Sequence, residues 1–307
     1  MTIFKERVTA YAKINLFLKV RGKRQDGYHL LSTLMQTVSI CDYVTVECSD
    51  CALQDGLEPG ISLMTDAAFV PADARNTAYK AARAFLTVLE RQNVSVKIHI
   101  LKGIPVQAGM AGGSTDAAAV LNALARVFPA AVSTDELLSM AARIGADVPF
   151  CMAGGTQLCE GIGDILTSVP SLCGLPLLFI KPHCSISTPW AFSVFDNLTP
   201  ANKVCPEENA ALQRFLMPRA GMDPIQRVID AAPYLNNDLE DVADREYPIL
   251  SEIRAFLMDQ GAVAARMSGS GSTVFGIFSD KKTRDTAFDH AGAYQTMGFF
   301  VKAGETV

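Results

Sequence analysis

The most informative stretch of the sequence runs Ile104-Pro-Val-Gln-Ala-Gly-Met-Ala-Gly-Gly-Ser-Thr-Asp-Ala-Ala-Ala119. A loop of small residues lets backbone N–H groups approach an anion closely, and a helix that begins directly after it adds free donors and the positive end of its dipole. The stretch therefore predicts a phosphate-binding loop, in which Ser114 and Thr115 offer hydroxyls to phosphate or magnesium. The alternative interpretation is a helix packed tightly on a sheet through small residues.

Strands and helices are expected on both sides of this loop. Residues 94–100 alternate between apolar and polar, which predicts a strand with His99 pointing away from the core. Residues 8–20 alternate in the same way and predict a half-buried strand, with Lys13 and Asn15 on one face about 7 Å apart. Further helices are expected over 76–92, 114–128 with Ser114 as N-cap, 133–144 and 248–260, and further strands over 262–267 and 272–278. This mixture, without strict alternation of strand and helix, favours an α+β fold over a doubly wound sheet.

Length and charge limit the function classes. A chain of 307 residues exceeds the roughly 250–300 residues at which a single core stops growing, so we expect two domains, residues 1–161 and 162–307. Lys and Arg number 27 and Asp and Glu 32, a net charge of −5, which argues against a nucleic-acid binder. The N-terminus lacks the apolar core of a signal peptide, and no apolar run approaches the roughly 20 residues of a membrane span. We therefore expect a cytoplasmic protein.

The eight cysteines are scattered among apolar neighbours, as expected of buried free thiols in a reducing compartment. Cys48-x-x-Cys51 has no second pair and no nearby histidine, so no metal site is predicted there. The polar stretch 199–208 is expected to be a loop.

Two other segments carry chemical groups. Asp147, in Gly145-Ala-Asp-Val-Pro-Phe150, precedes an apolar stretch that would partly desolvate its carboxylate, so it is a candidate general base; alternatively it is a helix-end aspartate. The Gly-Ser turn of Arg266-Met-Ser-Gly-Ser-Gly-Ser-Thr273 could hold a phosphate edge or simply close a hairpin. The chain has no G-x-x-x-x-G-K-[ST], G-x-G-x-x-G, H-R-D or D-F-G motif, which disfavours the common nucleotide-binding folds.

Together and in this order, these segments resemble the GHMP kinase superfamily. Its second motif is P-x-G-x-G-L-[AG]-G-[GS]-S-[ST]-[DN]-A-A. This loop departs from it because many members of the superfamily have Gly or Ala and then Gly where this chain has Gln107 and Ala108, and Leu where it has Met110. Ala12-Lys-Ile-Asn-Leu16, Asp26-Gly-Tyr-His-Leu-Leu31 and Asn237-Asp-Leu-Glu240 resemble the branch whose substrate carries a cytidine diphosphate.

The resemblance implies a ribosomal-protein-S5-like N-terminal domain and a ferredoxin-like C-terminal domain, both α+β, with ATP and the second substrate meeting in the cleft between them. It implies ATP-dependent phosphorylation of the 2-hydroxyl of a diphosphocytidyl methylerythritol, a step of the non-mevalonate route to isoprenoid precursors. Magnesium would be held largely by nucleotide and water, without a dedicated metal cage. We expect small-molecule partners, no nucleic acid or membrane, and a monomer or homodimer.

The resemblance also assigns roles to residues. Asp147 matches the catalytic aspartate, and Lys13 the lysine that favours the anionic states of the transfer. Asn15 matches a substrate contact, and Asn76 falls where an asparagine meets adenine. The cytosine grip would comprise Tyr28, His29 and Phe192, with Thr188 as a neighbouring polar contact. The ATP loop would comprise Pro105, Val106, Gln107, Ala108, Gly109, Met110, Ala111, Gly112, Gly113, Ser114 and Thr115.

Two other functions stay open at this point. The first is another GHMP kinase, acting on homoserine or mevalonate, which Tyr28, His29 and Phe192 disfavour because those substrates have no flat base. The second is a catalytically dead nucleotide-binding or interaction protein on the same fold. Lys13 and Asp147 argue against it, because a dead copy has no chemical reason to keep them.

Overall fold

The computed structural model describes residues 4–50, 60–89, 94–198, 213, 215–218 and 221–307. Packing divides the chain into two compact units, each assembled from separate segments. The first unit comprises Met1–Ala12, Ile40–Ile104 and Ala111–Ala153, and the second comprises Lys13–Ser39, Pro105–Met110 and Gly154–Val307. The expected domains, residues 1–161 and 162–307, divide the chain at a single point, and that boundary stays a prediction.

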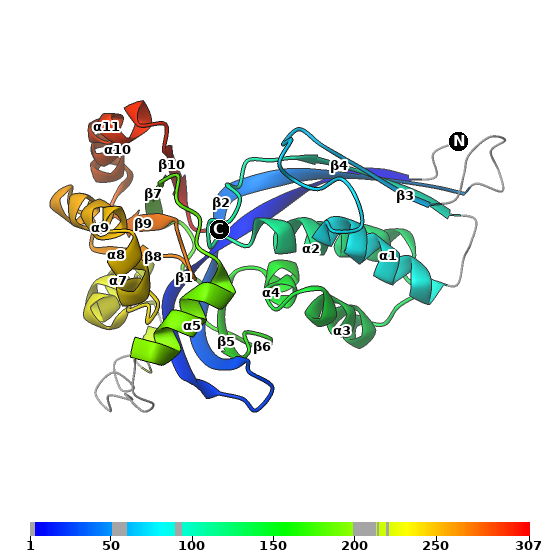
Figure 1. The fold of residues 1–307 in the computed structure, drawn as a ribbon, viewed down its shortest axis with the longest axis horizontal. Helices are drawn as coiled ribbons and strands as arrows, with labels where there is room; N and C mark the ends of the chain where they lie inside the picture. The colour runs from blue at the N-terminus through cyan, green and yellow to red at the C-terminus, as the bar shows by residue number, and fades with distance from the viewer. Residues whose placement is uncertain (1–3, 51–59, 90–93, 199–212, 214, 219–220) are drawn as a thin grey trace. The chain divides into compact units, whose positions relative to one another are not determined.

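The first unit packs helices against strands. Its strands are β3 (Gly60–Thr65), β4 (Val94–Leu101) and the adjoining parts of β1 (Phe4–Lys23) and β2 (His29–Asp50). Strand β4 pairs antiparallel with β2 and parallel with β3. The helices are α1 (Thr77–Leu89), α2 (Gly112–Val127), α3 (Thr134–Ile144) and α4 (Val148–Ala153). Figure 1 shows α1 and α2 along one side of β3 and β4, and the core lies between these layers.

Local patterns predicted much of this unit correctly. Strand β4 buries Val96, Ile98 and Ile100 while Lys97 and His99 are exposed. Helix α3 begins after Ser133, which forms a capping box with Glu136, the N-terminal signal that the sequence carries. Helix α1 also forms as predicted, although the last residues of the expected span, 90–92, lie outside the described part of the chain.

The second unit contains two groups of paired strands. The first part of β2 pairs with β5 (Thr156–Gly161), which pairs with β6 (Ile165–Ser168). A four-stranded antiparallel sheet follows, in the order β10 (Phe300–Glu305), β7 (Pro176–Lys181), β9 (Val274–Ile277) and β8 (Ala264–Met267). The helices are α5 (Thr188–Leu198), α7 (Pro224–Ala231), α8 (Glu240–Glu246), α9 (Ile249–Asp259), α10 (Lys281–His290) and α11 (Gly292–Thr296), with a 3-10 turn, η2 (Ala232–Tyr234). Figure 1 shows α9 and α10 on the same side of this sheet, and the mixed architecture confirms the α+β class.

The strand predicted over residues 8–20 is confirmed within β1, but it is not half-buried throughout. Residues 12–18 are buried on both faces, Lys13 and Asn15 included. Strand β2 was not expected at all; most of residues 32–40 are buried on both faces, so no alternating pattern marks it. Apolar and polar residues alternate along a strand when one of its faces meets solvent, so a strand that is covered on both faces does not show the alternation.

Among the cysteines in the described part of the chain, Cys41, Cys173 and Cys184 are free thiols. Cys48 and Cys159 are buried as expected, but Cys173 is exposed. Cys51, Cys205 and the expected loop 199–208 lie outside the described residues. None of the helices described is long and apolar enough to cross a membrane.

Candidate active site

The predicted phosphate loop connects β4 to α2 through an irregular backbone. Gln107, Gly109 and Ala111 have positive φ angles of 51°, 72° and 59°. Left-handed residues in a turn aim successive N–H groups into an anion-binding concavity. Of the three departures from the family motif, Ala108 and Met110 are buried, whereas Gln107 is exposed and adopts a backbone conformation that suits glycine better.

Helix α2 begins earlier than expected. Its N-cap is Ala111, without a side-chain cap, and the first intrahelical bond runs from the Thr115 N–H to the Ala111 carbonyl at 2.9 Å. The prediction of Ser114 as N-cap was therefore wrong, because the left-handed turn at Ala111 already starts the helix. The N–H groups of residues 112–114 have no intrahelical acceptor, which is the arrangement that binds phosphates.

The two predicted hydroxyls differ in their surroundings. Thr115 is buried and donates to the Tyr11 carbonyl at 2.5 Å, so its proton is engaged by β1. Ser114 is half-buried, and its Oγ would lie 3.7 Å from a Cβ on Gly145. The start of α2 therefore lies beside the segment that carries Asp147.

Asp147 and Asn76 belong to the same unit as α2. Asp147 is half-buried at the start of α4, and its carbonyl accepts the Cys151 N–H at 3.0 Å. Asn76 precedes α1: its Oδ1 accepts the Ala78 N–H and its Nδ2 donates to the Pro71 carbonyl, both at 2.8 Å. The Thr77 hydroxyl donates to the Gly113 carbonyl at 2.6 Å, which ties the start of α1 to the start of α2.

In the second unit, Lys13 and Asn15 form a buried polar pair. The Lys13 ammonium donates to Asn15 Oδ1 at 2.7 Å, which confirms that the two side chains share a face of β1. Asn15 Nδ2 donates to Thr33 Oγ1 at 2.8 Å, and the Thr33 hydroxyl donates to the Phe17 carbonyl at 2.6 Å. This chain of hydrogen bonds fixes the amide that orients the ammonium.

The Gly-Ser turn packs directly on this pair and on the loop. The Ser268 hydroxyl donates to the Gly109 carbonyl at 2.8 Å and accepts the Asn15 N–H at 3.3 Å. Lys13 also binds the loop through its backbone, because its N–H donates to the Met110 carbonyl at 3.2 Å. Three segments far apart in sequence therefore meet within the second unit.

Asn237 holds the Gly-Ser turn in place. Its Nδ2 donates to the carbonyls of Met267 and Gly269 at 2.9 and 2.7 Å. Sequence reasoning assigned no function to Ser268 or Asn237 individually, although both lie in motifs that it singled out. Their importance comes from contacts that span 30 or more residues.

The residues expected to hold a cytosine form a second cluster of this unit. His29 stacks on Phe192, with ring centroids 4.5 Å apart, and its Nε2 lies 2.7 Å from Asp196 Oδ1. Hydrogen bonds from Lys23 and then from His29 lower the pKa of Asp196, so this carboxylate is ionised at neutral pH. Tyr28 is 61% exposed. Sequence reasoning missed Asp196, which stands one helical turn beyond Phe192 on α5.

Thr188, at the first position of α5, lies 2.8 Å from the Ser270 hydroxyl. It therefore joins α5, which also carries Phe192, to the Gly-Ser turn. Its contact with a substrate stays a prediction.

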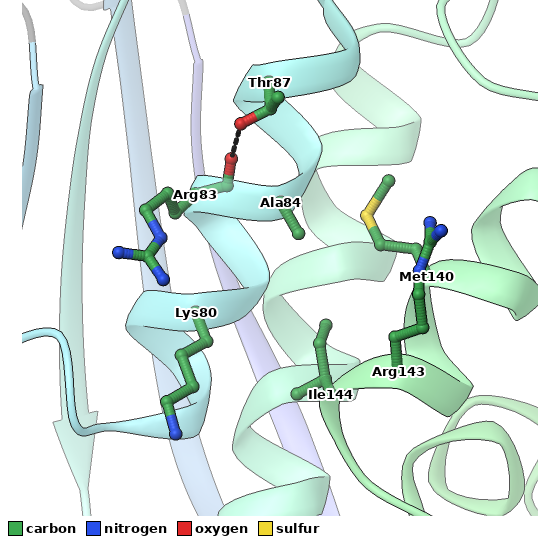
Figure 2. Close-up of a pocket in the computed structure, with 7 residues that line it drawn as sticks. All are labelled: Lys80, Arg83, Ala84, Thr87, Met140, Arg143 and Ile144. Carbon is green, nitrogen blue, oxygen red and sulfur yellow. Dashed lines mark hydrogen bonds between the residues drawn. The ribbon is translucent and has the colours of Figure 1, made fainter.

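A pocket of about 420 Å³ in the first unit contains none of the predicted residues. Its walls come from α1 and α3 (Figure 2), namely Lys80, Arg83, Ala84, Thr87, Met140, Arg143 and Ile144. Figure 2 shows the Arg83 guanidinium pointing away from Arg143, so the cations do not converge on one anion. We assign this pocket no part in the site.

Comparison with known proteins defines the class of the molecule. The GHMP kinases N terminal domain matches residues 76–155, and the GHMP kinases C terminal domain matches residues 225–294. The structure of a homoserine kinase from Cytophaga hutchinsonii has the same fold, with a TM-score of 0.73 over 100% of this chain and 96% of that one, at 17% identity. Fold and motifs thus define a GHMP kinase.

The family within that class follows from closer relatives. A protein of Clostridium botulinum (strain Langeland) named 4-diphosphocytidyl-2-C-methyl-D-erythritol kinase is 41% identical over 283 residues, 92% of this chain and 94% of the relative. A crystal structure of 4-(cytidine 5'-diphospho)-2C-methyl-D-erythritol kinase matches with a TM-score of 0.72 and 30% identity, covering 98% of this chain and 99% of that one. The chain belongs to the 4-diphosphocytidyl-2-C-methyl-D-erythritol kinase family.

Proposed function

We propose that this protein transfers the γ-phosphoryl group of ATP to the 2-hydroxyl of 4-diphosphocytidyl-2-C-methyl-D-erythritol. The observation that carries the proposal is the 41% identity over 92% of the chain to a kinase of that name. The homoserine and mevalonate kinase structures, at 17% and 14% identity, share only the fold. The His29–Phe192 stack adds a chemical reason, because a flat aromatic surface suits a pyrimidine ring, and neither homoserine nor mevalonate contains such a ring.

ATP would bind through the loop. The N–H groups of residues 112–114 and the positive end of the 16-residue α2 would hold its β- and γ-phosphates. Asn76 would meet the adenine, since it stands at the start of α1, which Thr77 ties to Gly113. These contacts fix the γ-phosphorus for in-line attack, which is most of what a kinase must supply.

Asp147 and Lys13 would act on the transfer itself. Asp147 accepts the proton of the substrate 2-hydroxyl. The hydroxyl oxygen bonds to the γ-phosphorus, and the bond between the γ-phosphorus and the oxygen that leaves with ADP breaks. The Lys13 ammonium, held by Asn15 at 2.7 Å, stabilises the negative charge that develops. The products are ADP and the phosphorylated substrate, and the hydroxyl proton is left on Asp147.

Magnesium enters this proposal with the nucleotide. Magnesium commonly keeps several waters and takes one or two protein ligands together with phosphates. Among the described residues there is no group of three or more His, Cys, Asp or Glu that could hold a metal. The half-buried Ser114 hydroxyl at the start of α2 fits as a single protein ligand, and the ion would neutralise phosphate charge. Cytoplasmic location and a monomeric or homodimeric state stay predictions.

A substrate panel tests the proposal. Purified protein is mixed with ATP, magnesium and one acceptor at a time (4-diphosphocytidyl-2-C-methyl-D-erythritol, homoserine or mevalonate), and ADP release is followed. We expect turnover with the first acceptor only. Turnover with homoserine or mevalonate would assign another branch of the class. A folded protein that binds ATP but phosphorylates none of the three acceptors would support the alternative of a catalytically inactive nucleotide-binding protein.

A further inference from the structure

Asp42, Lys102 and Asp116 form a buried ionic triad that the proposed chemistry does not use. The Lys102 ammonium contacts Asp42 Oδ2 and donates to Asp116 Oδ2 at 2.8 Å. Asp42 is fully buried and Asp116 is 2% exposed. Because well-packed apolar residues would often be at least as stabilising as buried ions, such a triad calls for a reason beyond stability.

The triad joins the two ends of the phosphate loop. Asp42 Oδ1 accepts the N–H groups of Gly103 and Ile104 at 2.6 and 2.8 Å, just before the loop starts at Pro105. Asp116 lies on α2, two residues after Ser114. Asp42 therefore holds the residues that lead into the loop, and the Lys102 ammonium links Asp42 to the helix that leads out of it.

Glycines permit this close approach at both ends. A Cβ on Gly103 would collide with the Cys41 carbonyl oxygen of β2. A Cβ on Gly112 would lie 3.4 Å from the Lys102 ammonium and 3.2 Å from Ile104 Cγ2. A side chain at Gly103 would therefore push the entry of the loop away from β2, and a side chain at Gly112 would press on Lys102 and Ile104.

We infer that Asp42, Lys102 and Asp116 are positioning residues, which hold the start of the loop and the first turns of α2 so that the N–H groups of residues 112–114 are preorganised for the phosphates of ATP. None of the three needs to touch the nucleotide. The inference rests on the proposed ATP site. It explains why a motif that binds phosphate carries an aspartate facing inward.

Asp42→Asn is the main test. The amide oxygen can still accept the two loop N–H groups, but the charge that faces Lys102 is lost. We expect the Kd of adenylyl imidodiphosphate, measured by calorimetry, to rise at least about ten-fold, because small displacements of a positioned site cost large factors. The Kd of cytidine diphosphate should stay within about two-fold.

Asp66→Asn is the matched control. Asp66 Oδ1 accepts the Lys102 backbone N–H at 3.0 Å, yet the residue is exposed and lies outside the triad. An asparagine keeps that acceptor, so both dissociation constants should stay within about two-fold of the native values.

A second variant covers the case in which Asp42→Asn does not fold. Lys102→Met combined with Asp116→Asn removes the ammonium while Asp42 keeps its two N–H donors. Binding is measured well below the melting temperature of each variant. Weakened binding of the ATP analogue alone supports the inference. Native affinity for it in a folded variant, or a parallel loss of both ligands, overturns the inference. Native protein that binds the analogue but does not turn over the cytidine substrate contradicts the proposed function instead.

Discussion

Gly109 and Ser268 lie so close that glycine is the only residue the position accepts. A Cβ on Gly109 would overlap the Ser268 carbonyl oxygen, and it would stand 3.0 Å from the carbonyl carbon and 3.1 Å from the Gly271 nitrogen. All three obstacles are backbone atoms, which cannot rotate away. The phosphate loop and the Gly-Ser turn therefore touch main chain to main chain.

Gly109→Ala should displace the loop. We expect a loss of about 1–3 kcal/mol from overpacking, added to about 1–2 kcal/mol for a Cβ at positive φ, with weaker ATP binding. Urea denaturation and calorimetry measure the two effects. Gly155→Ala is the control, because Gly155 has a similar φ of 69° but no atom within 4 Å of its Cβ position. Equal losses in the two variants would show that the contact with Ser268 is unimportant.

Thr33→Val should disturb Lys13 from a distance. It removes the hydroxyl that accepts from Asn15 and donates to Phe17, so a buried amide and a buried carbonyl lose their partner. We expect a destabilisation of about 1–3 kcal/mol and a lower kcat. The control is Thr37→Val on the same strand: within the described structure the Thr37 hydroxyl is buried without a hydrogen-bond partner, so its loss should be neutral or stabilising. A native kcat in folded Thr33→Val would show that catalysis does not depend on the hydrogen bond between Thr33 and Asn15.

Asp116 should make stability depend on pH. Burial raises its pKa from 3.8 to about 7; the Lys102 ammonium opposes this shift and the Asp42 carboxylate adds to it. The folded state then holds a proton that the unfolded state releases, so the free energy of unfolding should fall as pH rises from about 4 to about 7. Asp116→Asn should remove this decline, which urea denaturation at several pH values measures. A native-minus-variant difference that stays constant over this range would contradict the shift.

Phe192→Leu should weaken the cytidine substrate selectively. The leucine keeps apolar volume but loses the ring that stacks on His29, so we expect its KM to rise about ten-fold with the KM of ATP unchanged. Phe299→Leu is the control, because it removes another histidine–phenylalanine contact, with His183, in the same unit. Similar effects of both variants on KM would mean that the stack has no special part in binding.

Asp147→Asn tests the base. The amide cannot accept the hydroxyl proton, so kcat should fall by at least about 10². Affinity for ATP should be retained, since the phosphates are proposed to bind the loop. Steady-state rates and calorimetry on the same preparation measure both quantities, and a variant with a native rate would remove Asp147 from this role.

Sequence reasoning succeeded where the signal is local. The alternation of β4 and the Ser133–Glu136 capping box involve neighbours two to three residues apart, and both were found. It failed for β2, whose two faces are largely buried over residues 32–40 and leave no alternation to read. It misplaced the start of α2 because the cap is a backbone conformation at Ala111, and side-chain patterns do not report φ.

By itself, the sequence determined the family, and it predicted a phosphate loop, a base and a cation, since each is encoded in a short run of neighbouring residues. Only the tertiary structure decided how those groups are held. Tyr43 pairs with Leu101, which places Asp42 beside Lys102 although 60 residues separate them. Ser268 reaches Gly109 across 159 residues. Contacts of this kind depend on strand register and on packing between distant segments, which no local pattern encodes.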